Sequence, residues 1–82
     1  MSCFLARRAE TNAFVDDLLA KYKAQAALQV GNPNVCIELR DYPSDELMER
    51  VVAELSQRRY RATPVEYTAT DGRYGVIWLE PR

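Results

Sequence analysis

The chain has 82 residues, of which 48% are hydrophobic and 28% charged, and its 11 basic and 12 acidic side chains give a net charge of −1. A chain of this length forms one small domain that buries about two-thirds of its unfolded surface, so we expect residues 1–82 to be a single domain. Nucleic-acid-binding domains usually carry a basic excess, which argues against that class. The sequence contains no histidine, the commonest general base and metal ligand.

The first expected element is a long helix over residues 5–28, where neither glycine nor proline interrupts the sequence. A helix of about 24 residues is roughly 36 Å long, whereas strands of six or seven residues reach only about 20–23 Å. We therefore expect the amino-terminal end, with Phe4, Leu5 and Arg8, to overhang the sheet and to contact a partner. A bent helix that folds back on the domain is the alternative.

A strand is expected over residues 35–40, because apolar and polar side chains alternate there. Ser44 then begins a second helix over residues 44–58, since serine is a good N-cap. No glycine is present where this helix must end, so Arg59 or a neighbour is expected to adopt the left-handed conformation.

The remaining expected element is a hairpin over residues 62–80 with a two-residue turn at Asp71-Gly72. That turn would place Tyr67 opposite Val76 and Val65 opposite Trp78. Pro64 cannot donate to a ladder, so its strand belongs at an edge. The sequence therefore predicts an α+β fold with the layout α-β-α-β-β, in which two helices cover one face of a three-stranded antiparallel sheet of order 1-3-2.

The hairpin has two faces, and one of them must pack against the helices. Aromatic side chains dominate core energetics, so we expect the aromatic face to point inward; it carries Val65, Tyr67, Tyr74, Val76 and Trp78. Ile77 and Leu79 would then lie on the outer face and contact a protein. In the alternative, the aromatic face points outward and stacks against bases.

Catalytic motifs are not evident, and we expect no catalytic residue, metal site or cofactor. The three glycines are scattered and cannot form a phosphate-binding loop. Cys3 and Cys36 are expected to be free thiols, and two distant cysteines make a poor zinc site.

A cluster of arginines is expected near one end of the sheet, formed by Arg58, Arg59, Arg61 and Arg73. Together with Trp78 it could contact an anion or a nucleotide. The simpler interpretation is that Glu54 and Asp71 balance these charges.

The segments "ELMERVVAEL", "RRYRAT" and "YGVIWLE" give residues 35–80 a resemblance to small orphan proteins encoded by bacteriophages. That pattern has a glycine before its aromatic residue, where this chain has Arg59. The resemblance implies an accessory protein of inhibitor type, or a minor virion protein, that acts by binding; it assigns no role to any residue.

These observations predict a non-enzymatic protein-binding or assembly module that acts as a homo-oligomer or within a larger complex. A nucleotide or single-stranded nucleic-acid binder is the alternative. No apolar stretch approaches the roughly 20 residues that span a bilayer, and the start of the chain lacks the order of a signal peptide. We therefore expect no membrane contact and a cytoplasmic location, in the host cell if a phage encodes the protein.

Overall fold

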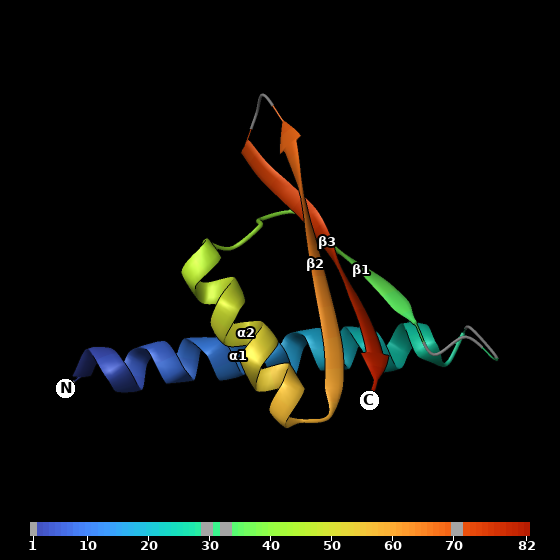
Figure 1. Cartoon of the computed structure of the whole chain (residues 1–82), viewed down its shortest axis with the longest axis horizontal. Coiled ribbons are helices and arrows are strands. Elements are labelled where there is room, and N and C mark those ends of the chain that lie inside the picture. Colours follow the sequence, from blue (N-terminus) through green and yellow to red (C-terminus); the bar gives the residue numbers. More distant parts are fainter. Residues whose placement is uncertain (1, 29–30, 32–33, 70–71) are drawn as a thin grey trace.

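The structure is a computed structural model that describes residues 2–28, 31, 34–69 and 72–82, and the side chains of all of these except 2–6, 68 and 69. The elements follow in the order α1 (Ser2–Ala26), β1 (Val35–Leu39), α2 (Asp45–Gln57), β2 (Tyr60–Ala69) and β3 (Gly72–Pro81) (Figure 1). The strands form one antiparallel sheet of order β1-β3-β2. The predicted α+β fold is confirmed.

Helix α1 is a continuous helix that extends beyond the rest of the fold. Its buried residues recur every three or four positions and therefore share one side of the helix: Thr11, Val15, Leu18 and Tyr22. Residues 7–10 are exposed, and Figure 1 shows the amino-terminal end of α1 passing beyond α2 and the sheet. The overhang is thus confirmed, while the predicted contacts of Phe4 and Leu5 lie outside the described side chains.

Helix α2 begins and ends as the sequence predicts. The hydroxyl of Ser44 accepts a hydrogen bond from the Leu47 N–H (3.2 Å), and Asp45 and Glu46 place negative charge in the first turn, where the helix dipole favours it. After the C-cap residue Arg58, Arg59 has φ 68°. This is the left-handed conformation that lets the chain turn from α2 into β2.

We expect Arg59→Gly to stabilise the protein by about 0.5–1 kcal/mol. A side chain in the left-handed conformation costs about 1–2 kcal/mol, and the greater freedom of glycine in the unfolded chain cancels part of the gain. Urea unfolding would measure the change. Arg59→Ala is the control, because it removes the charge but keeps the strain; an equal gain from both variants would contradict the explanation.

The hairpin has a different register from the predicted one. Val65 pairs with Val76, Tyr67 with Tyr74 and Ala69 with Gly72; of the two predicted turn residues, Gly72 belongs to β3 and Asp71 lies outside the described residues. The prediction that Tyr67 faces Val76 is therefore wrong. The observed register brings the rings of Tyr67 and Tyr74 together, and cross-strand aromatic pairs stabilise hairpins. The observed pairing differs from the predicted one by two residues. Because side chains alternate between the two faces of a strand, each side chain stays on the same face of the sheet as in the predicted register.

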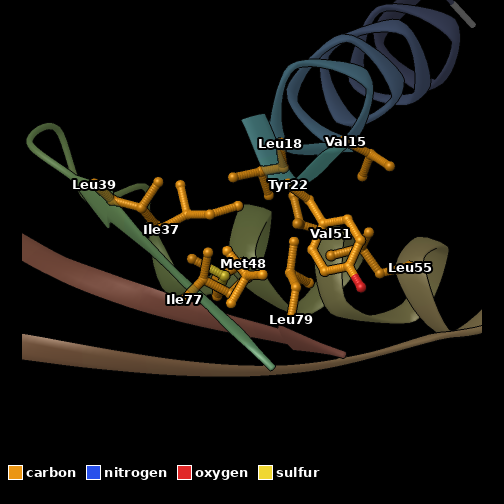
Figure 2. Packing of buried hydrophobic residues seen from close by; sticks show 11 residues of the cluster. Val15, Leu18, Tyr22, Ile37, Leu39, Met48, Val51, Leu55, Ile77 and Leu79 are labelled. Carbon is orange, nitrogen blue, oxygen red and sulfur yellow. The ribbon is translucent and has the colours of Figure 1, made fainter. Parts of the chain in front are cut away.

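The core lies between the two helices and one face of the sheet, as Figure 2 shows. Ile77 and Leu79 are fully buried, so the prediction that they lie on the outer face and contact a partner is wrong. The other core residues come from α1, α2 and β1: Val15, Leu18, Tyr22, Val35, Ile37, Leu39, Met48, Val51 and Leu55. Burial raises the pKa of the Tyr22 phenol, and nearby Tyr60 and Glu80 raise it further.

Strand β1 explains why the aromatic face points away from the helices. Glu38 pairs with Val76 and Cys36 with Trp78, and directly opposite residues share a face of the sheet. Burying the aromatic face would therefore bury the carboxylate of Glu38, which is costly without a partner. The observed arrangement buries only aliphatic side chains of β1 and β3.

The turn end of the hairpin extends past β1 and α2 (Figure 1). On its inner side the ring of Tyr42 lies against Gly75, and the Tyr42 N–H donates to the Arg73 carbonyl (3.3 Å). Strand β2 is at a sheet edge and contains Pro64, as predicted.

Candidate functional site

The strongest candidate site is the face of the sheet opposite the helices, which we call the outer face. Trp78, Tyr67, Tyr74 and Val65 are 36–44% exposed there, and no described residue forms a layer over them (Figure 1). Contiguous exposed apolar residues of this kind mark interaction sites more often than isolated ones do. The outer face is therefore the part of the described surface that most needs a functional explanation.

The outer face is built from parallel rows of directly paired residues. Tyr67 and Tyr74 form the row nearest the turn, and their rings stack with centroids 5.5 Å apart and planes 29° apart. The next rows run across the sheet in the order Val65–Val76–Glu38, then Thr63–Trp78–Cys36, and Arg61 pairs with Glu80 in the last.

The rows place short side chains between long aromatic ones. Tyr74 and Trp78 are four residues apart on β3, which separates them by about 13 Å along the strand. Between them lie Val65 and Val76, whose side chains are much smaller than the rings.

The outer face carries charges of both signs. Glu38 is exposed and makes no ion pair with any residue that the structure describes. Arg61 and Glu80 lie 3.5 Å apart and balance one another. Arg40, two residues after Glu38, is exposed as well, so the charges on and beside this face favour ligands of neither sign.

The predicted cluster of arginines forms only in part, because Arg73 lies apart from Arg58, Arg59 and Arg61. Arg73 lies near the turn of the hairpin, whereas Arg61 lies in the Glu80 row, about 23 Å away along β3. Arg58 donates to Asp16 (2.7 Å) and to Glu54 (2.9 Å), and these hydrogen bonds raise its pKa. Its partner Glu54 was expected from the sequence, but Asp16 was not.

Arg73 supports the hairpin rather than forming an anion site. It donates to Glu66 and to Asp45 Oδ1 (3.0 Å), and these hydrogen bonds raise the pKa of its guanidinium. Its guanidinium also lies 5.6 Å from the ring centroid of Tyr42. Burial raises the pKa of the Tyr42 phenol, and neighbouring Glu66 adds to the effect. Arg73 is thus a link between α2 and the far end of the hairpin.

A cleft of about 570 Å³ lies between α1 and α2, with Arg8 in its wall. Three of its charged groups bind one another: Glu46 Oε1 contacts Arg7 (3.1 Å) and Arg50 (2.9 Å). The buried hydroxyl of Thr11 accepts from Arg50 Nε (3.2 Å) and donates to the Arg7 carbonyl (2.8 Å). These interactions hold the two helices together, so we assign the cleft a structural role.

The chemistry of the described side chains offers no other site. Among them, no three acidic or cysteine residues converge as metal ligands do. Cys36 is a half-buried free thiol on the outer face. No helix in this part of the chain combines the length and apolarity of a membrane span.

Sequence reasoning identified Trp78 as a candidate, but it gave an exposed aromatic face with Tyr67 and Tyr74 only as the alternative to a buried one. The signal that could have found them is the alternation in residues 35–40, since Glu38 must lie on the exposed face. No protein-family model, curated protein sequence or solved structure matches this chain.

Proposed function

We propose that this protein is a non-enzymatic protein-binding module that uses the outer face of its sheet, within a homo-oligomer or a larger complex. The observation that supports this proposal is the exposure of Tyr67, Tyr74 and Trp78 on one face. Each aromatic side chain has an area of about 150–250 Å², of which about two-fifths is exposed here. Together with Val65 and Val76, the three rings give an apolar patch of about 300–400 Å². This is the size of a functional patch on a small protein.

The outer face is held rigid by the core beneath it. Its side chains alternate along β3 with Ile77 and Leu79, which are fully buried, and β3 is the central strand. Side chains on a rigid strand lose little conformational entropy when they bind. Tyrosine and tryptophan are also the residues that most often contribute large binding energies at protein interfaces.

The cellular location and the biological context that we propose for this protein rest on the sequence alone. We propose a cytoplasmic accessory protein of inhibitor type, or a minor virion protein, because of the resemblance to small bacteriophage orphan proteins.

A single-stranded nucleic acid is the second candidate partner, because exposed Tyr67, Tyr74 and Trp78 are suited to stacking against bases. The charges give it little support. Binding to phosphates requires free lysine or arginine side chains, whereas three of the four predicted arginines, Arg58, Arg61 and Arg73, are paired with carboxylates, and exposed Arg59 is the one that makes no ion pair with a described residue. Quenching of the single tryptophan by oligonucleotides, weakened by salt, would favour this candidate.

Replacing Tyr67, Tyr74 and Trp78 together by threonine tests the proposed function. Threonine suits a strand, so the variant should fold, as circular dichroism would show. Two measurements apply: the mass in solution over a wide concentration range, and selection of binders from a mixed peptide display library. We expect any association through the outer face to weaken at least about 10-fold, as expected for loss of large interface side chains.

The control is Leu28→Thr, which removes an apolar side chain that is 84% exposed on another part of the surface. It should bind like the unchanged protein. A monomer that selects no peptide, or peptide binding that survives the triple replacement, would contradict the proposed function.

A further inference from the structure

We propose that two copies of this chain pair through the free edge of β1, in an antiparallel ladder that brings Glu38 of each copy opposite Arg40 of the other. The two-fold axis of this dimer passes between the two Leu39 residues, and the three strands of each copy join into one sheet. This inference goes beyond the proposed function, because it uses the edge of the sheet and leaves the outer face open to a partner.

The direction of the backbone groups in β1 follows from the hairpin. The carbonyl oxygen of Val65 is directed at β3, where it would overlap a Cβ atom on Gly75. Successive residues of an antiparallel strand direct their N–H and C=O groups to opposite sides, so those of Pro64 are directed away from β3. Its partner Ile77 therefore directs its groups at β1 and bonds to Ile37, the residue opposite.

The same alternation leaves the backbone groups of Glu38 free. Because Ile37 is bonded to β3, Glu38 directs its N–H and C=O groups to the edge, and among the described residues no strand pairs with this edge. The chain still runs beside β3 after β1 ends, since the Tyr42 N–H donates to the Arg73 carbonyl (3.3 Å). Arg40 therefore lies along the same edge as Glu38.

The charges of Glu38 and Arg40 make this edge complementary to itself. Both residues are exposed, and neither makes an ion pair within the described part of the chain. Charged residues at an edge usually keep other strands away, so a strand that pairs here must carry opposite charges at the matching positions. A second copy of β1 meets this condition, because opposite charges directly across a ladder attract one another.

The charges also select the register. A ladder centred on Leu39 places each Glu38 opposite an Arg40 and gives about four backbone hydrogen bonds. A ladder centred on Glu38 would place two carboxylates opposite each other, which is destabilising. A ladder centred on Ile37 would place Glu38 opposite Cys36 and would leave the charges unpaired.

A cleft beside this end of β1 adds an apolar contact. It has a volume of about 340 Å³, and Phe14, Leu39 and Arg40 form part of its wall. Phe14 is half-buried and packs against the core. In the ladder the two Leu39 residues form a pair without hydrogen bonds, in which side chains approach most closely. The second copy thus covers the cleft and removes part of its apolar wall from water.

Reversal of single charges tests the dimer, with light scattering from micromolar to millimolar concentration as the measurement. We expect the unchanged chain to approach twice the monomer mass. Glu38→Arg and Arg40→Glu should each weaken the association at least about 10-fold, because each places like charges opposite one another. Glu49→Arg, an exposed replacement on α2, is the matched control and should leave the association unchanged.

Restored pairing is the decisive result. The double variant Glu38→Arg/Arg40→Glu exchanges the two charges and should dimerise like the unchanged chain. An equimolar mixture of the two single variants should form a mixed dimer, because one variant is positive and the other negative at both positions. Amide hydrogen exchange of Glu38 should also slow at concentrations where the dimer forms. A monomer at every concentration, charge reversals without effect, or a mixture that does not associate would overturn the inference.

The two proposals fail separately. If library binders depend on Tyr67, Tyr74 and Trp78 but charge reversal at the β1 edge does not change the mass, this inference fails and the proposed function stands. If the dimer responds to charge reversal but no binding depends on the three rings, the proposed function fails and this inference stands.

Discussion

Leu79→Ala should lower the free energy of unfolding by about 2–5 kcal/mol, which is the range for truncating a fully buried leucine. Leu79 is fully buried and lies on the central strand opposite Val35 and Ala62. Its removal leaves a cavity between the sheet and both helices. A domain of this length is stabilised by only about 4–12 kcal/mol, so the variant should be partly unfolded at physiological temperature.

Urea unfolding followed by circular dichroism would measure this loss. The control is Val76→Ala on the outer face of the same strand, which we expect to cost about 1 kcal/mol or less, in the range of strand propensity. If Val76→Ala were the more destabilising replacement, the assignment of the two faces would be wrong.

Gly75→Ala should destabilise the protein by about 3 kcal/mol or more, at the upper end of the range for overpacking. A Cβ atom at this position would overlap the Val65 carbonyl oxygen and would lie 2.7 Å from Cδ2 of Tyr42. The carbonyl belongs to the paired strand, so β2 and β3 would have to separate locally. A single methyl group would thus disturb both the hairpin and its packing against Tyr42.

The double variant Tyr42→Ala/Gly75→Ala distinguishes the two contacts. Tyr42→Ala removes the ring and its contact with Arg73, but the close carbonyl of Val65 remains. We therefore expect Gly75→Ala to stay destabilising in the Tyr42→Ala background, measured as the difference between two urea unfolding curves. A negligible cost in that background would show that only the ring prevents a side chain at position 75.

Local signals explain why the elements were predictable. The hydroxyl of Ser44, the uninterrupted run before Gly31 and the alternation around Ile37 each act over a few residues. Arg59 is a similar case, because the missing glycine at the end of α2 identified the residue with positive φ.

The candidate site was harder to predict because it depends on how the strands pair. The large area of the aromatic rings suggested that Trp78 and Tyr74 face the core. The pairing between β1 and β3, however, places them on the same face of the sheet as Cys36 and Glu38. The positions and partners of the arginines were hard to predict for a similar reason. Arg58 binds Asp16, which is 42 residues away in sequence, and such long-range contacts leave no local pattern.

Pro64 bears on how this protein stays dispersed in water. Among the described residues no further strand pairs with either edge of the sheet, and unpaired edge strands are the usual starting points for aggregation. The β1 edge has five residues, whereas the β2 edge has ten. A proline in a ladder turns its nitrogen away from the neighbouring strand, so Pro64 removes one donor near the middle of the longer edge. A second copy that paired along β2 would therefore lack a hydrogen bond near the middle of the new ladder, which disfavours growth of the sheet at the edge beside the exposed aromatic face.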